Sequence, residues 1–287
     1  MAGCFMAICL AKRDYDVVVY ESRPDVRLEN YDSGRSFNLT LYYRGIKAMK
    51  ELGIWDEAKK VAVIAQGNVA HYENRNVYDS FDAKGNEILY TVHRNRLNGA
   101  LLTAAEKYEN IEFQFNTKCV GVDSERREVS LETDSGQARM TIVKADLVIG
   151  ADGVNSAVRS FIPTDKEHLW VKKYEDWGYK EVHISPERTK ELKLRLLSTH
   201  TWPRPDSLLI AFPNPDESFT LMFNLQLEGE KSFVSLTTEK EIAAFISADF
   251  PDLMPLVPEI IHAFQKKKIG TFVTLYNPLW HDQDFMV

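Results

Sequence analysis

The chain has 287 residues, a formal net charge of -7 at neutral pH, 44% hydrophobic residues and 27% charged residues. This composition is typical of a globular protein, and the length suits one large domain or two of ordinary size. The mild acidity and the lack of a long basic run exclude a broad surface for nucleic acid. No stretch reaches the ~20 apolar residues that a membrane-spanning helix needs, so no membrane segment is expected.

The cysteines and histidines indicate neither disulfides nor a metal site. Cys4, Cys9 and Cys119 are too few and too scattered for a disulfide framework or for a zinc site with paired cysteines. The seven histidines show no ligand spacing, so no metal is predicted. This cysteine usage favours a reducing compartment, and the cytoplasm is the expected location.

The opening segment predicts a helix followed by a strand. Residues 2–13 suit a helix, and Lys12 and Arg13 follow the apolar stretch, which is the reverse of the order in a secretion signal. The run Val17–Tyr20 is apolar on both faces and predicts a buried parallel strand, so the segment forms half of a βαβ unit. The strand leads to Glu21. In a dinucleotide-binding fold an acidic side chain at this point accepts hydrogen bonds from ribose hydroxyls; a plain surface glutamate is the alternative.

Spacing favours the dinucleotide-binding interpretation. In the fingerprint G-x-G-x-x-G an acidic residue follows after about 20 positions, and Gly3 precedes Glu21 by close to that spacing. If Gly3 is the last glycine, the first two glycines and the strand before them lie upstream of Met1. The sequence is therefore expected to begin inside its own cofactor motif.

The middle of the chain predicts alternating helices and strands, followed by a β-meander. The expected elements are a loop and helix over 34–53, a strand over 61–71, a polar stretch to 86, a strand over 89–92 and an amphipathic helix over 94–108. From residue 111 onward, alternating segments separated by polar turns predict the meander, with the segment IEFQF at 111–115 as its first strand.

After residue 163 longer strand candidates with proline-rich connections predict an antiparallel sheet, and they include the segment KLRLL at 193–197. Thr238 and Glu241 have the spacing of a capping box at the start of a helix, and a second helix is expected over 259–267. The second half of the sequence therefore differs from the first in its longer predicted strands and its proline-rich connections.

The stretch Asp146–Arg159 reads DLVIGADGVNSAVR: a strand, a glycine turn with an acidic residue, then a helix start. Glycine lets a backbone approach a ligand closely, and the N–H groups at a helix N-terminus favour phosphate. Turns of this shape are common in α/β proteins. Spacing alone therefore leaves a cofactor role and a purely structural role both open.

The segment LVIGADGVNSAVR closely resembles the D-G motif of flavin-dependent aromatic hydroxylases of the para-hydroxybenzoate hydroxylase type. In that family the motif lies between the FAD and nicotinamide sites. The segments LAKRDYDVVVYESR, GRSFNLTLYYRG, HRNRLNGALLTAAEKY and HTWPR narrow the resemblance to the members that hydroxylate kynurenine to 3-hydroxykynurenine. The resemblance extends over essentially the whole chain.

The resemblance implies a set of FAD-binding residues. They are Ala2 and Gly3 at the pyrophosphate, Glu21 and Arg23 at the adenosine ribose, Thr40 and Cys119 through their backbone, Arg94 near the flavin or its phosphates, and Asp152 and Gly153 in the D-G turn. Arg159 either serves this turn or is a salt-bridging surface residue. No side chain is expected to act as a general base, because the cofactor carries the chemistry.

The resemblance also implies the cofactors, the reaction and the fold. NADPH reduces FAD, and the reduced flavin activates O2 so that one oxygen atom is transferred to an electron-rich aromatic ring, while the protein positions the ring and excludes water. The expected fold is α/β: a Rossmann-like FAD-binding domain with a β-meander over 1–165, without its first strand and with 61–92 on the substrate side. A substrate-binding domain on a mainly antiparallel sheet with helices follows over 166–275, and 276–287 return toward the FAD-binding domain.

The expected substrate clamp departs from the family pattern. The arginine that binds the substrate's amino-acid carboxylate is replaced at the matching position by Asn68, which cannot supply a bidentate charged fork. The tyrosine partner falls near Asp82, although Phe81 or Tyr78 could fill its place. Kynurenine and a related tryptophan-derived aromatic that lacks the carboxylate are therefore both kept as candidate substrates.

Both ends of the family pattern are expected to lie outside the sequence. The later G-D motif should begin just after Val287, so weak or no FAD binding is expected of this polypeptide. Two alternatives stay open: a truncated, non-catalytic paralogue or isoform that binds a partner or ligand, and another flavoprotein such as a halogenase or reductase.

Overall fold

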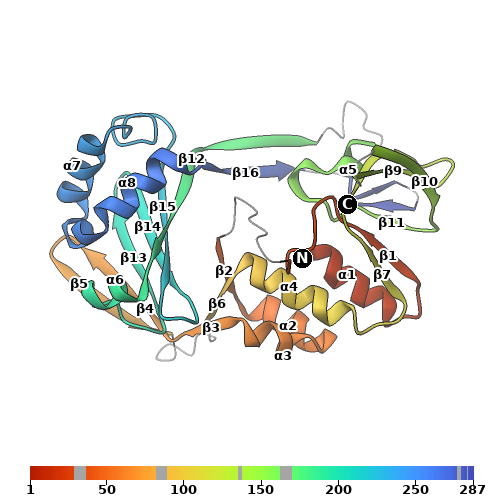
Figure 1. Ribbon diagram of the computed structural model, residues 1–287, viewed down its shortest axis with the longest axis horizontal. Coiled ribbons are helices and arrows are strands. Elements are labelled where there is room, and N and C mark those ends of the chain that lie inside the picture. The colour runs from red at the N-terminus through yellow and green to blue at the C-terminus, as the bar shows by residue number, and fades with distance from the viewer. Residues whose placement is uncertain (29–36, 82–88, 135–137, 162–169, 277–278, 283) are drawn as a thin grey trace. The chain divides into compact units, whose positions relative to one another are not determined.

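The computed structural model describes the chain except for residues 29–36, 82–88, 135–137, 162–169, 277–278 and 283 (Figure 1). The chain folds into two compact units. Unit 1 comprises 1–33, 98–173 and 273–287, and unit 2 comprises 34–97 and 174–272. The domain boundaries at 165 and 275 stay predictions.

The described residues of unit 1 form three small sheets with helices beside them. Its main elements are α1 (Ala2–Ala11), β1 (Val17–Tyr20), β7 (Ile111–Gln114), β8 (Thr117–Asp123), β9 (Glu128–Asp134), β10 (Ala138–Lys144), β11 (Val148–Ile149), η2 (Gly153–Asn155), α5 (Ala157–Phe161), β17 (His281–Asp282) and β18 (Phe285–Met286). β1 pairs in parallel with β7, β8–β9–β10 form an antiparallel meander, and β11 pairs in parallel with β18. α1 packs against β1 and β7, which gives the Rossmann-like layer.

Two expectations about these strands were wrong. The segment at 111–114 does not begin the meander but pairs with β1, because Asn110 ties the two chain segments together by donating to the carbonyls of Ala11 and Tyr15. β1 was expected to be buried on both faces, yet Val18 and Tyr20 remain 45% and 37% exposed. In the described residues α1 covers β1 from one side, so successive side chains alternate between partial burial and exposure.

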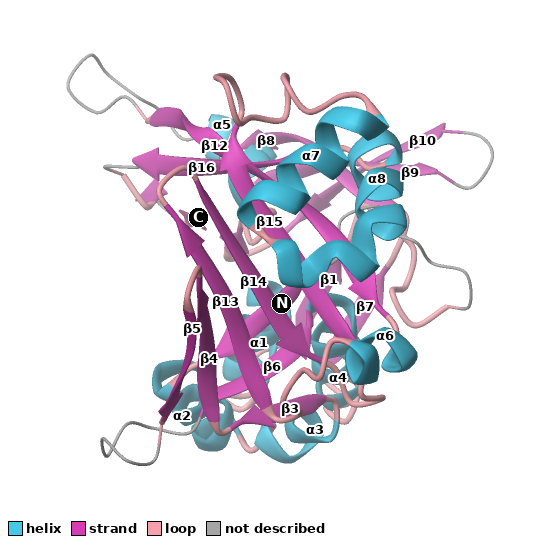
Figure 2. Cartoon of the chain, turned by 90° about the vertical axis from the view of Figure 1, so that its left-hand side faces the viewer, coloured by secondary structure: helices cyan, strands magenta, loops and turns pink. Residues whose placement is uncertain are grey.

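Unit 2 is built on a seven-stranded sheet of order β16-β12-β15-β14-β13-β4-β5 (Figure 2). These strands are β4 (Gly67–Tyr72), β5 (Arg75–Ser80), β12 (Val171–Ile184), β13 (Ser198–Arg204), β14 (Ser207–Pro213), β15 (Phe219–Gln226) and β16 (Gly270–Tyr276). The helical elements after β15 are α7 (Glu239–Asp249), η3 (Pro251–Leu256) and α8 (Val257–Lys266), and α6 (Pro186–Glu191) follows β12. A second sheet, β2-β6-β3, is accompanied by two helices.

The elements of this second sheet lie early in the chain. They are β2 (Asn38–Leu41), α2 (Tyr43–Leu52), α3 (Trp55–Lys60), β3 (Ala62–Ala65) and β6 (Leu89–His93), after which α4 (Arg94–Ala105) leaves unit 2 for unit 1. The segment of β2 was predicted as a loop and that of β5 as part of a polar stretch. Each becomes a strand because a neighbouring strand, β6 or β4, satisfies its backbone groups.

The main core of unit 2 lies between the large sheet and its helices. Because side chains alternate across a strand, Phe219, Leu221, Phe223 and Leu225 of β15 all point to one side, and all are fully buried. We call this side the helix face of the sheet, since α7, η3 and α8 contribute to the same core. The other side, which carries Asn68, is called the open face.

Local signals explain how the helical layer begins. Thr238 and Glu241 form the predicted capping box: Thr238 Oγ1 accepts from the N–H of Glu241 at 3.2 Å, and Glu241 Oε2 accepts from the N–H of Thr238 at 2.8 Å. The strand predicted at 193–197 was wrong. Lys193 and Leu197 have φ values of 53° and 58°, which turn the chain between α6 and β13.

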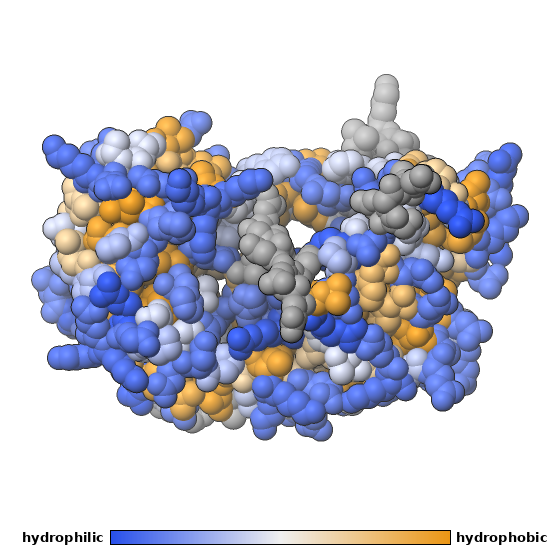
Figure 3. Space-filling model, viewed as in Figure 1, coloured by the Kyte–Doolittle hydropathy of each residue, from blue (hydrophilic) through white to orange (hydrophobic). Residues whose placement is uncertain are grey.

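Hydrophilic residues predominate on the face of the molecule shown in Figure 3, with apolar residues in small scattered groups. None of the helices in the described part of the chain combines the length and the apolar character needed to span a bilayer.

Candidate functional site

The expected FAD-binding residues fall in both units. In unit 1 three of the predicted segments converge. A Cβ placed on Gly3 would lie 3.6 Å from the Cβ of Ala151, so the first turn of α1 lies against the residue that precedes the D-G turn. Cys119 of β8 lies close enough to Asp152 to feel its charge: burial, and then this carboxylate, raise the pKa of the thiol.

Glu21 follows β1 and is held by Arg23. The guanidinium donates from Nε to Oε1 at 2.9 Å and from Nη2 to Oε2 at 3.1 Å, and the Arg23 N–H donates to Oε1 at 3.0 Å. The Thr117 N–H donates to the Glu21 carbonyl at 3.0 Å, which places the carboxylate beside the start of β8. The strand end, its acidic residue and Cys119 are thus brought into one neighbourhood.

The Glu21 carboxylate stays ionised. Burial alone would raise its pKa, but the hydrogen bonds from Arg23 outweigh burial and lower it. An ionised carboxylate only accepts hydrogen bonds, and its two oxygens offer more lone pairs than Arg23 occupies. This arrangement suits the neighbouring hydroxyls of a ribose, which both donate.

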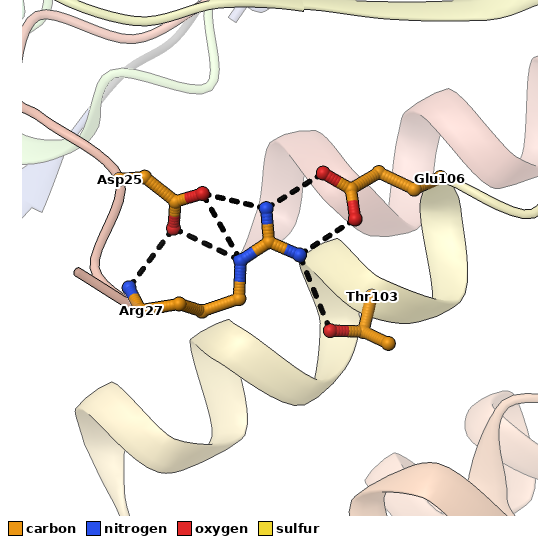
Figure 4. Close-up of polar contacts among 4 residues, drawn as sticks. All are labelled: Asp25, Arg27, Thr103 and Glu106. Atoms are coloured by element: carbon orange, nitrogen blue, oxygen red, sulfur yellow. Dashed lines mark hydrogen bonds and ion pairs between the residues drawn. The ribbon is translucent and has the colours of Figure 1, made fainter.

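The segment after Arg23 is anchored by Arg27, a role that the sequence did not suggest (Figure 4). The guanidinium of Arg27 forms ion pairs with Asp25 and Glu106, both at 2.6 Å, and donates to Thr103 Oγ1 at 3.3 Å. Its aliphatic stem covers Gly99, where a Cβ would approach the Arg27 Cγ to 3.2 Å. Because Glu106 stands 79 residues from Arg27, no local pattern could have revealed the pairing.

The D-G turn is stabilised by its own residues. Gly153 has φ of 81° with open space around it, a conformation that favours glycine. Asp152 Oδ2 accepts from the N–H of Ala157 at 2.6 Å at the start of α5. Arg159 is 5% exposed and donates to the carbonyls of Gly153 and Val154 at 3.2 and 2.6 Å. Arg159 therefore serves the turn and is not a surface residue.

The start of α1 suits a bound anion. The first N–H groups of a helix have no acceptor within the helix. Among the described residues no side chain caps the start of α1, and no acidic residue stands in its first turn. The helix dipole adds a partial positive charge at this end. The N–H groups near Ala2 and Gly3 thus fit a pyrophosphate, and with Glu21 they form a donor and acceptor set that fits FAD.

The other predicted cofactor residues belong to unit 2. Thr40 lies on β2 opposite Thr91 of β6, which is fully buried and donates to the Pro213 carbonyl at 2.8 Å. Arg94 begins α4; its N–H donates to the Phe37 carbonyl at 3.1 Å, and its guanidinium carbon lies 5.7 Å from the centre of the Phe37 ring. Phe37 therefore fixes both the backbone and the side chain of Arg94.

An aromatic row continues from Phe37 along the open face. The rings of Phe37 and Tyr179 meet edge to face with centroids 5.7 Å apart, and the Tyr179 ring centroid lies 5.3 Å from that of Phe272. A Cβ on Gly270 would overlap the Tyr179 ring, so only glycine leaves room for this ring. No sequence pattern indicated the row, because its members stand far apart in the chain.

Asn68 is fixed within the sheet. Its amide donates to Thr201 Oγ1 at 3.0 Å and accepts from Thr199 Oγ1 at 3.0 Å, both on the parallel strand β13. Asn68, Thr199 and Thr201 form a polar ladder on the open face. The prediction for Asp82 lies outside the described residues.

Tyr78 cannot take the place expected beside Asn68. Tyr78 pairs with Val69, whereas Asn68 pairs with Asp79, so Tyr78 points to the opposite face. There it covers Gly67, and its ring centroid lies 3.9 Å from the guanidinium carbon of Arg195.

Among the residues that the structure describes, no group of three or more His, Cys, Asp or Glu side chains could hold a metal ion.

Comparisons with known proteins give consistent results. A family model described as FAD binding domain matches residues 1–240. Kynurenine 3-monooxygenase of Legionella pneumophila (strain Corby) is 33% identical over 287 residues, which cover 99% of this chain and 63% of the relative. The enzyme of the same name from Myxococcus xanthus (strain DK1622) is 32% identical over 283 residues, which cover 98% of this chain and 61% of the relative. The chain thus spans less than two thirds of the length of these relatives.

Solved structures agree on the fold. The tetrameric form of 2-methyl-3-hydroxypyridine-5-carboxylic acid oxygenase matches with a TM-score of 0.74 at 19% identity, covering 99% of this chain and 71% of the other. PqsL of P. aeruginosa in complex with 2-aminobenzoylacetate matches with a TM-score of 0.69 at 14% identity, covering 99% and 74%. The expected α/β fold class, with a Rossmann-like layer and a large sheet covered by helices, is confirmed by these likenesses.

Proposed function

The chain belongs to the family of FAD-binding domains whose model matches residues 1–240, and on this premise we propose that it serves an FAD- and NADPH-dependent monooxygenase. This oxidoreductase would hydroxylate a small aromatic substrate with O2. The observation that carries the proposal is the convergence in unit 1 of the α1 start, the Glu21–Arg23 pair and the D-G turn.

Each of these groups would have a distinct task toward FAD. The N–H groups near Ala2 and Gly3 would bind the pyrophosphate, and Glu21, oriented by Arg23, would accept from the adenosine ribose. Asp152 and Gly153 would keep the D-G turn in the conformation that lets the backbone approach the cofactor. When bound, FAD supplies the redox chemistry that activates O2, with NADPH as the source of electrons.

Two further groups of residues complete the proposal. Thr40 and Cys119 would contact FAD mainly through their backbone, and Arg94, held by Phe37, would place its charge near the flavin or its phosphates. No side chain is assigned as a general base. The protein's remaining tasks are to position the ring and to exclude water from it.

The proposed substrate is kynurenine or a related tryptophan-derived aromatic. The identity of 33% to kynurenine 3-monooxygenases supports kynurenine. The polar ladder argues for a substrate with less negative charge, because the Asn68 amide is neutral and already bonded to Thr199 and Thr201. The amide and the two hydroxyls therefore suit a neutral hydrogen-bonding group better than a carboxylate.

The decisive experiment uses the natural gene product that contains these residues. FAD binding is measured by flavin fluorescence, and NADPH oxidation is followed with kynurenine and with kynuramine, which lacks the carboxylate. Oxidation stimulated by either compound, with a product heavier by one oxygen atom, supports the proposal. FAD binding without any hydroxylated product would favour a halogenase or reductase, and the lack of FAD binding would favour a non-catalytic binding protein.

We also propose a cytoplasmic location. Cys4, Cys9 and Cys119 are free thiols, which suits a reducing compartment. The mitochondrial outer membrane is the alternative. Fractionation of cells that express a tagged natural protein distinguishes the two.

A further inference from the structure

A buried pair of histidines lies on the helix face of unit 2 and has no part in the proposed chemistry. His71 of β4 and His200 of β13 are 9% and 1% exposed, and His71 Nε2 lies 2.8 Å from His200 Nδ1. Trp202, fully buried, stacks on His71 with ring centroids 4.3 Å apart and donates from Nε1 to Asp252 Oδ2 at 2.6 Å. Asp252 belongs to η3, so the cluster joins the helical layer to two neighbouring strands.

The hydrogen bonds fix which ring nitrogens carry protons. His200 Nε2 lies 3.1 Å from the Arg195 carbonyl, which only accepts, so this nitrogen carries a hydrogen. In the neutral ring His200 Nδ1 is then an acceptor, and His71 Nε2 must donate to it. His71 Nδ1 is therefore left without a proton, and it lies 3.6 Å from Asp252 Oδ2.

We propose that Asp252, His71 and His200 form a clasp between η3 and the sheet that binds one proton intact and opens when it binds a second. The first proton adds to His71 Nδ1, where it faces the Asp252 carboxylate and leaves every other hydrogen bond in place. The only ring nitrogen then left without a hydrogen is His200 Nδ1, so the second proton must bind there, opposite the N–H of His71. Two donors then face each other at 2.8 Å, and the pair separates.

The surroundings of the pair fit this order of protonation. Three groups face the His71 residue: Asp252 on η3, Asn76 on β5 and Arg204 on β13, whose guanidinium donates to the His71 carbonyl. His200 faces the carbonyl of Arg195 before β13. Asp249 at the end of α7 and Tyr78 on β5 contact the two arginines. Asn76 bonds to the His71 ring, and its amide can turn to donate to a bare nitrogen or to accept from a protonated one. His71 thus has partners in both states, whereas His200 has partners in one.

A route for the first proton is present. Asp252 and Asn76 both line a cavity of about 480 Å³, together with Arg204. The cavity reaches Asp252, which lies 3.6 Å from His71 Nδ1, and Asn76, which bonds to the His71 ring, so solvent can exchange a proton beside this ring. His200 lies behind His71 and does not line this cavity.

The pKa values of both histidine rings are lowered, which agrees with a clasp that is stable in its neutral form. Burial lowers the pKa of His71, against the attraction of Asp252, and burial lowers the pKa of His200 to about 4. An unfolded histidine binds its proton near pH ~6.5. The unfolded chain therefore takes up more protons than the folded one as the pH falls below that value, so the stability of the clasp is full above pH ~6.5 and is lost toward the folded pKa of His200.

The first test needs no substitution. In the full 287-residue chain with 15N-labelled histidine, long-range ¹H–¹⁵N spectra report the protonation of each ring nitrogen as the pH is lowered. We expect His200 to carry a proton only on Nε2 wherever the near-UV circular dichroism is native, and His71 to become doubly protonated first. A doubly protonated His200 in a chain with native near-UV signal would overturn the proposal, as would a proton on His200 Nδ1 at neutral pH.

The second test removes the second proton site. In His200→Gln the amide can still accept from His71 and donate toward Arg195, but it cannot bind a proton. The midpoint of the acid-induced loss of near-UV signal should move lower by about one pH unit. His183→Gln is the matched control, because His183 is exposed on β12 of the same sheet and should leave the midpoint unchanged. Identical midpoints in the wild type and both variants contradict the clasp; if His200→Gln fails to fold, the spectra of the unsubstituted chain decide.

Discussion

The candidate cofactor residues of unit 1 are held mostly by neighbours in the chain, whereas the polar clusters of unit 2 join residues that stand far apart. Arg23 orients Glu21 two positions away, and Asp152 accepts from a residue five positions on. By contrast, 129 residues separate His71 from His200. Short motifs can therefore specify the D-G turn of unit 1, while the large sheet of unit 2 takes its polar contacts from the order of its strands.

The largest change in stability is expected when a contact between residues far apart in the chain is removed. Trp202→Ala removes a fully buried ring from the core of unit 2 and leaves Asp252 without its indole donor. The free energy of unfolding in urea should fall by about 4 kcal/mol. Trp280→Ala is the control, because Trp280 is 60% exposed and should change stability little. A loss below about 1 kcal/mol in the first variant would mean that the distant cluster is less important than its burial indicates.

A local contact is expected to have the next largest effect. Arg159→Met keeps much of the side-chain volume but removes both hydrogen bonds to the carbonyls of the D-G turn. Stability should fall by about 2 kcal/mol, because two part-buried hydrogen bonds from a charged donor are lost. Arg126→Met, a substitution of a largely exposed arginine on the turn between β8 and β9, is the control. Equal denaturation midpoints in the two variants would show that the turn does not depend on Arg159.

The Glu21–Arg23 pair gives a prediction about FAD affinity. Glu21→Gln keeps the shape of the side chain and removes the charge that accepts from Arg23 and from the proposed ribose. The FAD dissociation constant of the natural protein should rise about tenfold, as expected for the loss of one charged hydrogen bond. Glu109→Gln, at an exposed position before β7, should leave flavin titrations unchanged. Unaltered affinity in Glu21→Gln would remove Glu21 from the proposed site.

The smallest changes in stability are expected from alanine substitutions at two glycines. Gly153→Ala should lower stability by about 1 kcal/mol, because alanine is strained at a φ of 81° even though the space around it is open. Gly45→Ala should raise stability by up to about 1 kcal/mol, since Gly45 lies inside α2 with open space around it. Thermal unfolding of both variants measures the two signs. Unchanged or raised stability in Gly153→Ala would show that the D-G turn does not require glycine.

The sequence predicted those features whose causes are local. The helix of 2–11 and the strand of 17–20 follow from apolar patterning, and the capping box of Thr238 and Glu241 follows from spacing alone. The strand, glycine turn and helix start around Gly153 were predicted from one stretch of chain, and the resemblance to a known family identified this stretch as a D-G motif. Arg159 was harder to interpret, since its carbonyl partners carry no sequence signal.

The features that escaped prediction depend on partners elsewhere in the chain. β2 and β5 have weak strand patterns and form because β6 and β4 lie beside them. Arg27 meets Glu106, which stands 79 positions away, only in the folded chain. The aromatic row of Phe37, Tyr179 and Phe272 likewise exists only in the folded sheet. The pattern of residues within a single segment cannot predict contacts between residues that stand far apart in the chain.

The polar ladder also constrains how this protein could change by mutation. A single substitution of Asn68 by arginine would add a positive charge to the open face, but it would also remove the partner that Thr199 and Thr201 share. A stable exchange of Asn68 for a charged residue would therefore require coordinated replacements on β4 and β13. A protein with only one of these replacements would leave polar groups of the ladder without partners, so the sheet would lose stability. Evolution from asparagine to a charged residue at this position would therefore pass through a less stable protein.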